Sequence, residues 1–195
     1  MLSQLRAAFM MVVLFTLVLG LGYPLAITGI AGLAFPHQAG GSLVRDSAGK
    51  VVGSELIAQG FTKPEYLHPR PSAAGNGYDP MASGGSNLGP TDPKLADRVK
   101  TDAAALRKEN PGAVIPADAV TTSASGLDPD ISPEYAQLQV ARIAKARGAS
   151  RSEVEAAING ATHGAFLGFI GQPGVNVLEV NRALDAHNPV VHLRS

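Results

Sequence analysis

Serine, histidine and aspartate side chains gather in one stretch of the chain, and together these residue types could support hydrolysis by a serine nucleophile. Such a site needs a serine within hydrogen-bond reach of a histidine base that an acidic residue orients. The stretch offers His68, Ser72, Asp79, Ser83 and Ser86. No G-x-S-x-G pattern accompanies them, and serines in a segment rich in proline and glycine usually form turns. The pattern therefore does not favour a hydrolase.

Metal-binding side chains are present, but not in the spacings that metal sites use. The sequence has no cysteine and no H-E-x-x-H motif. Its histidines are scattered: His37, His68, His163, His187 and His192. Asp128 and Asp130, with the carbonyl groups near Gly126, could coordinate a cation, although two carboxylates do not make an EF-hand. Because Asp128-Pro129 is equally typical of a turn, we predict no metal site.

A glycine-rich string, Ser83-Gly84-Gly85-Ser86-Asn87, could present backbone N–H groups to an anion, because glycine permits tight concave turns. The string lacks the lysine of the Walker motif G-x-x-x-x-G-K-[ST] and does not follow an evident strand. Taken alone, it does not identify a phosphate site.

The first element that must position these residues is a long apolar segment. From Ala7 to Pro36 the chain has 30 consecutive residues without a charge, whereas about 20 helical residues cross a bilayer core. We predict a transmembrane anchor over residues 7–29, in which Pro24 permits a kink. A cleaved signal peptide is the alternative, but its apolar core is normally only about 7–15 residues long.

The charges at its two ends orient this anchor. Arg6 and the terminal amine precede it, and the first charge after it is Arg45. The positive-inside rule then makes residues 1–6 a cytoplasmic leader. We predict that residues 30–195 lie outside the cytoplasm, on the periplasmic side of a bacterial inner membrane.

The exported region combines predicted helices with short strands. A hairpin is predicted over residues 41–57, and further strand candidates lie at 114–120 and 167–170. Helix-start and helix-stop residues delimit the predicted helices. These are expected at 93–110, 133–148, 150–161 and 176–187.

Two segments predict loops rather than regular elements. Residues 68–93 contain five prolines, and residues 121–133 are rich in serine. The predicted fold class is a single N-terminal transmembrane helix plus a mixed α/β soluble domain with long Pro/Gly-rich loops. A chain of 195 residues suits one such domain and an anchor. Acidic and basic residues, 16 of each, intermix along the chain, so no basic patch favours nucleic-acid binding.

Several of these loop and helix-end strings closely resemble one protein family. In chain order they are His68–Ala73, Ser83–Pro90, Val120–Pro129, Ile131–Pro133, Ala146–Gly148, Leu167–Phe169 and Val175–Leu178. They resemble the C subunit of the bacterial Kdp-type potassium-transporting ATPase, and the resemblance covers nearly the whole chain. Two departures are visible. Thr162-His163 stands where the family often has His then Thr, and Gln172-Pro173-Gly174 replaces a charged Glu and Arg.

The resemblance implies an accessory subunit of a high-affinity, ATP-driven potassium uptake pump. Its expected partners are a channel-like potassium-translocating subunit, a P-type ATPase subunit and the lipid of the inner membrane. In this family the subunit is described as a catalytic chaperone that raises the ATP affinity of the ATPase subunit. The chain has no D-K-T-G phosphorylation motif, and one span cannot by itself enclose an ion path. We therefore expect no catalytic residue in it.

The resemblance also implies candidate site residues. A nucleotide-binding role is implied for Ser83, Gly84, Gly85, Ser86 and Asn87, with ATP as a ligand but no tightly bound cofactor. The predicted topology separates this string from cytoplasmic ATP, so either the role is indirect or the topology is wrong, and we favour the topology. As partner contacts we predict Gly20, Gly22, Gly29, Pro69, Arg70 and Asp128. An anchored envelope enzyme and a tethered binding module are the alternatives.

Overall fold

The computed structural model describes residues 2–187, and their side chains from residue 4 onward. Met1 of the predicted leader and residues 188–195 of the predicted extracytoplasmic domain, with His192 among them, lie outside the described residues. The chain forms two units, Met1–Val52 and Gly53–Ser195.

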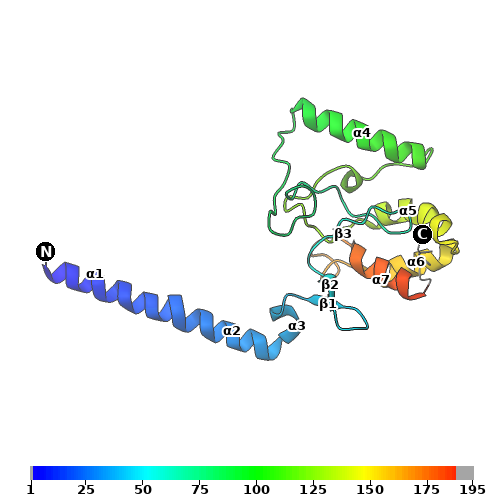
Figure 1. The fold of residues 1–195 in the computed structure, drawn as a ribbon. Helices are drawn as coiled ribbons and strands as arrows, with labels where there is room; N and C mark the ends of the chain where they lie inside the picture. The colour runs from blue at the N-terminus through cyan, green and yellow to red at the C-terminus, as the bar shows by residue number, and fades with distance from the viewer. Residues whose placement is uncertain (1, 188–195) are drawn as a thin grey trace. The chain divides into compact units, whose positions relative to one another are not determined.

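One long apolar helix dominates the first unit (Figure 1). It runs through α1 (Leu2–Phe15), a π-helical segment η1 (Thr16–Gly22) and α2 (Tyr23–Ala34). Within Gln4–Ala34, a window of 18 residues has a mean hydropathy of 2.2 and none of it is buried. At 1.5 Å per residue the 31-residue segment is about 46 Å long, which exceeds the ~30 Å of a bilayer core. The helix is therefore long and apolar enough to cross a membrane.

The π-helical segment η1 precedes Pro24 and accommodates it. A proline lacks the N–H group of the helix ladder, and its ring crowds the carbonyl group four residues earlier. The N–H of Tyr23 donates to the carbonyl of Val18, five residues back, so the wider turn makes room for the proline ring. The hydroxyl of Thr28 then donates to the Pro24 carbonyl at 2.8 Å.

A short helix and a hairpin follow the long helix. They are α3 (Pro36–Ala39), β1 (Leu43–Arg45) and β2 (Val51–Ser54), with β1 paired to β2. The carboxylate of Asp46 accepts from the N–H groups of Ala48 and Lys50, at 3.0 and 2.9 Å, which closes the turn. The predicted hairpin is confirmed.

Helices α4 to α7 and a small antiparallel sheet build the second unit. In chain order come α4 (Pro93–Glu109), a 3₁₀ turn η2 (Ala117–Ala119), β3 (Asp130–Ile131), α5 (Pro133–Arg147), α6 (Arg151–Gly160), β4 (Thr162–His163), β5 (Gly174–Asn176) and α7 (Val177–His187). The strand order is β3-β5-β4, and Val175 of β5 pairs with both Ile131 and Thr162. An apolar helix followed by a mixed α/β domain confirms the predicted fold class.

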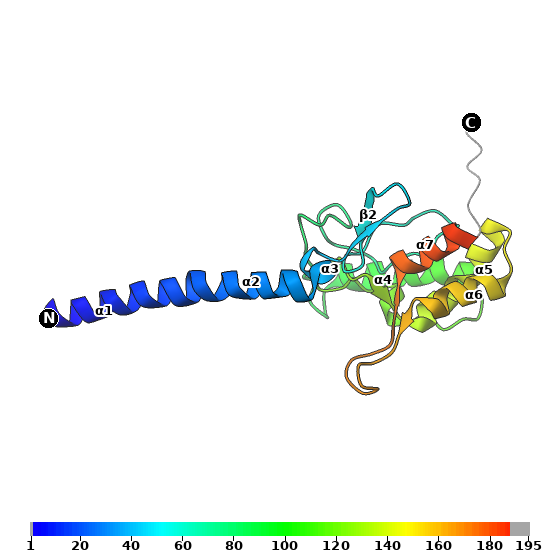
Figure 2. The ribbon, with the colours of Figure 1, turned by 90° about the horizontal axis from the view of Figure 1, so that it is seen from below.

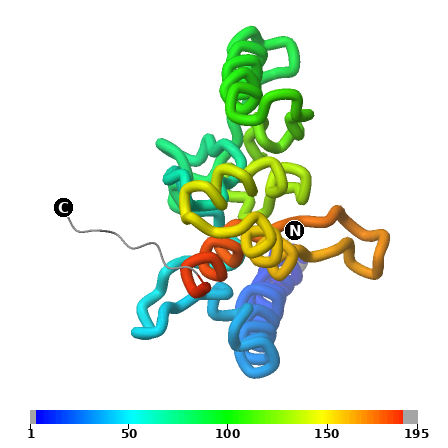
Figure 3. Tube along the Cα trace, turned by 90° about the vertical axis from the view of Figure 1, so that its right-hand side faces the viewer, coloured from blue at the N-terminus to red at the C-terminus, as the bar shows by residue number. Residues whose placement is uncertain are grey.

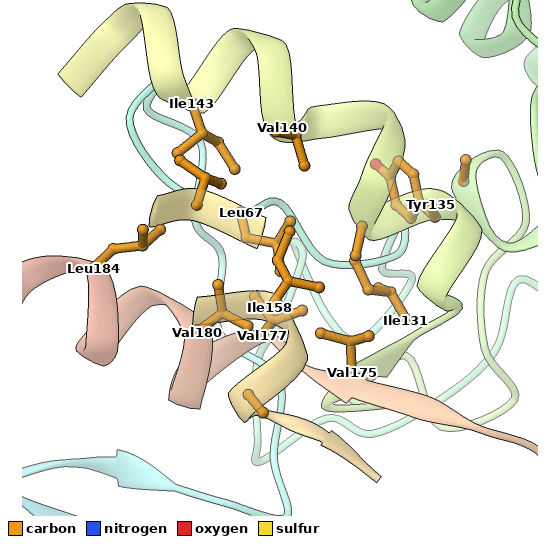
Figure 4. Close-up of a cluster of buried hydrophobic side chains, with 14 of the residues drawn as sticks. Leu67, Ile131, Tyr135, Val140, Ile143, Ile158, Val175, Val177, Val180 and Leu184 are labelled. Carbon is orange, nitrogen blue, oxygen red and sulfur yellow. The ribbon is translucent and has the colours of Figure 1, made fainter. Parts of the chain in front are cut away.

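The hydrophobic core lies where α5, α6 and α7 pack around β5 (Figure 4). Its fully buried side chains include Val140, Ile143, Ile158, Val175, Val177 and Val180. Leu67 also enters this core, although it belongs to an irregular segment. Helix α4 lies on the far side of α5 from α7 (Figures 1 and 3) and adds Ala103 to the core.

Local capping groups set the helix boundaries, and the predicted caps are confirmed. The Asp92 carboxylate accepts from Lys94 N–H at the start of α4, and the Ser132 hydroxyl caps α5 in the same way. Ser150 and Glu153 form a reciprocal capping box at the start of α6. Gly148 follows the last residue of α5 and caps the helix with a left-handed φ of 63°.

The strand predicted at 114–120 is wrong. Pro116 leads instead into the 3₁₀ turn η2. The carboxylate of Asp118 accepts from the N–H of Ser132 at 2.7 Å and from its hydroxyl at 2.9 Å. This contact with the start of α5 fixes the turn. In addition, Pro116 has no N–H to donate to a neighbouring strand, so the segment is unsuited to a central strand.

The strand predicted at 167–170 is also wrong. The segment turns back on itself: the N–H of Phe166 donates to the Ile170 carbonyl at 2.8 Å, and the N–H of Ile170 returns a bond of 2.9 Å. Leu167 has a φ of 53°, outside the strand region. An apolar run alone does not make a strand when no neighbouring strand pairs with it.

Candidate functional site

Side-chain amides from two helices hold the start of the proline-rich segment. Asn181 of α7 accepts from the Leu67 N–H at 2.7 Å and donates to the Leu67 carbonyl at 3.0 Å. The side chain of Gln139 in α5 accepts from the His68 N–H at 2.8 Å and donates to the His68 carbonyl at 3.1 Å. These bonds satisfy backbone groups as a neighbouring strand would. We call Asn181 and Gln139 the amide clamp.

Beyond the amide clamp, strings that are far apart in the sequence meet. The hydroxyl of Ser72 donates to the Gly126 carbonyl at 2.6 Å. The N–H of Gly84 and the hydroxyl of Ser83 both donate to the Ser125 carbonyl, at 2.8 and 3.0 Å. Three of the strings that carried the family resemblance therefore contribute to one structure. We call residues 68–74, 83–85 and 121–129 the loop cluster.

Gly126 is a point of close approach inside the loop cluster. Its φ of 67° lies in the left-handed region that favours glycine. A Cβ at this position would lie 2.7 Å from both the Ala74 nitrogen and the Gly84 carbonyl oxygen. Packing of three backbone segments therefore requires glycine here.

An ion pair joins two strings of the loop cluster. Arg70 Nη1 lies 2.9 Å from Asp128 Oδ2, and both side chains are partly buried. Arg70 also donates to the carbonyl groups of Thr121 and Thr122, each at 3.4 Å. The hydroxyl of Tyr78 donates to the Arg70 carbonyl at 2.7 Å, and burial raises the pKa of Tyr78. The backbone and the side chain of Arg70 are thus both fixed.

A shallow, open cavity of about 490 Å³ lies beside this ion pair. It is lined by Leu56, Arg70, Thr122, Ser123, Ala124, Ser125, Leu127, Asp128 and Pro129. The charged groups of this lining are Arg70 and Asp128, and they neutralise each other. The cavity therefore offers shape and short polar groups, with no excess charge to attract a phosphate or a cation.

The structure does not bring together the residues that suggested a hydrolase. Ser72 bonds to loop backbone, and His68 Nε2 lies 2.9 Å from the carbonyl of Lys63. The Asp79 carboxylate accepts from the N–H of Met81 at 2.9 Å. Within residues 4–187, no hydrogen bond joins a serine to His68. Ser72 instead joins two strings of the loop cluster, and Asp79 stabilises its own turn.

The predicted nucleotide-binding string Ser83–Asn87 contributes to the loop cluster and not to the lining of this cavity. The Ser83 hydroxyl and the Gly84 N–H donate to the Ser125 carbonyl. Gly85 lies so close to Ala124 that a Cβ would be 3.1 Å from the Ala124 carbonyl oxygen. Ser86 is half-buried and Asn87 is exposed. A strand–loop–helix phosphate site has a strand before the loop and a helix after it, whereas neither directly flanks this string. ATP binding by Ser83–Asn87 stays a prediction.

The two aspartates that could have shared a cation have separate partners. Asp128 faces Arg70, and its Oδ1 accepts from the N–H of Asp130 at 3.1 Å. Asp130 Oδ2 lies 3.0 Å from Nε2 of His163. In the described part of the chain, no three His, Asp or Glu side chains gather where they could hold a metal ion.

The remaining predicted contact residues have different environments. Pro69 is buried within the second unit, so its ring is not on the surface. In the long helix, Gly22 and Gly29 are seven residues apart and therefore lie on nearly the same face. Gly20 is only two residues from Gly22 and lies about half a turn away. A Cβ on Gly29 would meet no atom within 4 Å.

Sequence reasoning missed the amide clamp. Asn181 is 2% exposed and lies three residues from both Leu178 and Leu184, which are buried on the same side of α7. Gln139 is likewise buried, beside Val140 of α5. A polar residue at a core-facing helix position was the available signal, because a buried amide needs a polar partner.

A single apolar helix long enough to span a bilayer, followed by a small α/β domain whose polar loops bond to one another, is the architecture expected of a membrane-anchored protein. The family described as "K+-transporting ATPase, c chain" matches residues 5–186. The chain belongs to this family.

Relatives in several bacteria support this membership. The potassium-transporting ATPase KdpC subunit of Caulobacter sp. (strain K31) is 66% identical over 189 residues, which cover 97% of this chain and 96% of the relative. The subunit of the same name from Beijerinckia indica is 59% identical over 192 residues, or 97% of each chain. That of Koribacter versatilis is 50% identical over 188 residues, 96% of this chain and 97% of the relative.

Proposed function

We propose that this chain is a non-catalytic accessory subunit of an ATP-driven potassium uptake pump. Its family membership and the names of its relatives support this role. Residues 7–29, which lie within the helix Gln4–Ala34, anchor it in the bacterial inner membrane. Residues 1–6 face the cytoplasm and residues 30–195 lie on the periplasmic side, as the positive-inside rule favours.

Its partners in this proposal are a channel-like potassium-translocating subunit and a P-type ATPase subunit. The loop cluster is the observation that carries the proposal. Its polar side chains bond to backbone groups of neighbouring strings, and its ion pair is internal. A fixed surface of this kind, with a cavity and no excess charge, suits contact with a protein rather than catalysis. In the membrane, Gly22 and Gly29 allow close approach of a partner helix.

The chain influences ATP use indirectly in this proposal. By binding the ATP-competent form of the ATPase subunit more tightly than its other form, it raises the population of the form that binds ATP. The coupling is reciprocal, so ATP on the ATPase subunit also strengthens attachment of this chain. A direct contact of ATP with Ser83–Asn87 is not needed for this effect.

Co-purification tests the proposal. A C-terminally tagged chain is purified in mild detergent from potassium-starved cells, and its companions are identified by mass spectrometry. We expect a P-type ATPase and a channel-like protein. Ala124→Arg places a long charged side chain at an exposed position of the cavity lining, and we expect it to reduce recovery of the partners by roughly tenfold.

Val114→Arg is the matched control, because Val114 is 89% exposed and lies outside the loop cluster. It should leave partner recovery unchanged. If the wild-type chain came alone from several detergents, the accessory-subunit proposal would be wrong. Equal recovery with Ala124→Arg and Val114→Arg would remove the loop cluster from the contact surface.

A further inference from the structure

Four large apolar side chains gather on one exposed loop between β4 and β5. Phe166, Leu167, Phe169 and Ile170 are 69, 70, 77 and 51% exposed. We call residues 164–171 the apolar loop, and none of them has a charged or polar side chain. Figure 2 shows the connection from β4 to β5, in orange, projecting from the second unit. An exposed apolar group of this kind marks a site of contact with a protein or a membrane.

The backbone of the apolar loop satisfies much of its own hydrogen bonding. Phe166 and Ile170 exchange two N–H···O bonds, of 2.8 and 2.9 Å, and the N–H of Gly168 donates to the Ala165 carbonyl at 2.9 Å. Leu167 is held at a φ of 53°, which costs free energy for a residue other than glycine. A turn closed in this way can enter an apolar environment without leaving these groups unpaired.

The base of the apolar loop lies where the chain from the anchor joins the second unit. Strand β5 ends the loop, and the side-chain amide of its Asn176 donates to the Glu55 carbonyl at 2.9 Å. Glu55 is two residues from Gly53, where the second unit begins. A Cβ on Gly53 would lie 3.0 Å from Leu178, at the start of α7. The junction with the anchor and the base of the apolar loop are therefore neighbours.

The connection between the anchor and this junction is short. Strand β1 pairs with β2, so the backbone at Leu43 lies about 5 Å from the strand that enters the second unit. Residues 35–43 follow the long helix and span at most about 30 Å, even if fully extended. Helix α3 shortens this reach further. The length of this connection therefore limits how far the start of the second unit can lie from the end of the long helix.

We propose that the apolar loop inserts into the outer-leaflet interface of the bilayer that holds the anchor. Lipid is the occupant because the loop offers apolar surface without charge or side-chain hydrogen bonding, and because the chain that leaves the anchor enters the second unit beside the base of this loop. The inserted loop is a second membrane contact that fixes how the domain is turned on the membrane. The inference rests on the membrane location and the outward orientation in the proposed function, and it does not depend on the pump partners.

The absence of cysteine from the chain allows a direct test with single cysteines. Phe169→Cys in the full chain carries an environment-sensitive fluorophore, and the protein is reconstituted in nanodiscs of uncharged phosphatidylcholine. We expect blue-shifted emission and quenching by a nitroxide lipid. Because the loop is uncharged, the quenching should persist at about 0.5 M salt. Met81→Cys, at a position 91% exposed, is the control. A fluorophore at this position should keep the emission wavelength that it has in water.

A second variant guards against weakened insertion by Phe169→Cys. Ala165→Cys keeps all four apolar side chains and should give the same lipid-dependent quenching. Quenching no greater than at Met81 for both variants would overturn the proposal. So would quenching that appears only after partner subunits are added, or only at high protein-to-lipid ratio, because the occupant would then be another protein or a second copy. Co-purification of the partners is a separate readout, so the two proposals fail separately.

Discussion

Gly126 and Gly148 have nearly the same backbone torsion, with φ of 67° and 63°, but different surroundings. A Cβ on Gly148 would meet nothing within 4 Å, whereas one on Gly126 would lie 2.7 Å from backbone atoms of two other strings. Alanine substitutions at the two glycines therefore separate two free-energy costs: that of a left-handed conformation at a residue with a Cβ, and that of disrupting the loop cluster.

We expect Gly148→Ala to lower the free energy of unfolding by about 1 kcal/mol, the cost of the left-handed conformation. Gly126→Ala should lower it by roughly 3 kcal/mol or more, because backbone must also move. Urea unfolding of the full chain in detergent, followed by circular dichroism, measures both. Equal losses would show that the contacts around Gly126 add nothing to stability.

His68 gives the loop cluster a pH dependence. Burial, and then the positive charge of Arg142, lower the pKa of His68 from its ordinary value of 6.5. Below 6.5 the unfolded chain therefore binds a proton more readily than the folded one. The contribution of His68 to stability is present in full above pH 6.5 and is lost as the pH falls through the lower folded pKa.

We expect the wild-type chain to lose more stability than His68→Gln when the pH is lowered from about 8 to about 5. Other titrating groups are common to both proteins and cancel in this comparison. Unfolding free energies at the two pH values provide the four numbers required. The same loss in both proteins would contradict the assignment to His68.

At the scale of elements, the amide clamp ties an irregular segment to two helices. Asn181 is the sharper test, because its side chain serves both the N–H and the carbonyl of Leu67, which is fully buried. Asn181→Ala leaves both groups without partners. We expect a loss of roughly 2–4 kcal/mol in unfolding free energy and faster proteolysis within residues 55–92.

Asn110→Ala is the matched control for the amide clamp. Asn110 donates its side-chain amide to the Leu106 carbonyl at 3.2 Å, near the solvent-exposed end of α4. Water can replace this hydrogen bond, so Asn110→Ala should lower the free energy of unfolding by about 1 kcal/mol or less. Proteolysis of residues 55–92 at the wild-type rate in Asn181→Ala would mean that the helices hold this segment by other contacts.

The elements differ in how far their sequence determines them. Helices α4, α5 and α6 were predicted correctly because their caps, such as Asp92 and Ser150, act within a few residues. Strands β3 to β5 have two or three residues each, and their pairing joins positions 11 to 46 residues apart. An apolar run such as 167–170 carries no information about whether a partner strand exists.

The loop cluster was likewise not predictable from residue types. Its bonds use the carbonyl groups of Ser125 and Gly126, and every residue has a carbonyl group. Only the family resemblance grouped the strings, and it did not say that they touch. The partner of Arg70 also depends on a contact 58 positions away in the sequence. Long-range backbone geometry, which sequence patterns do not encode, decides this part of the molecule.

At the scale of the whole molecule, the anchor and the apolar loop would together hold the domain at two points on one membrane. A domain held by a single flexible connection can turn freely, whereas a second contact restricts it. An accessory subunit that is already turned toward its partners loses less freedom when it binds them. Both proposals require the domain to be on the outer side of the membrane, so orientation is the property to measure.

Cysteine labelling in spheroplasts tests this orientation, since the chain has no native cysteine. Met81→Cys lies at an exposed site of the second unit, and Gln4→Cys lies in the predicted cytoplasmic leader. We expect a membrane-impermeant maleimide to label Met81→Cys in intact spheroplasts and Gln4→Cys only after lysis. This result would keep Ser83–Asn87 away from cytoplasmic ATP and make any effect on ATP affinity indirect. The reverse pattern would place the domain in the cytoplasm, where direct nucleotide binding by that string could operate and insertion of the apolar loop into the outer leaflet could not.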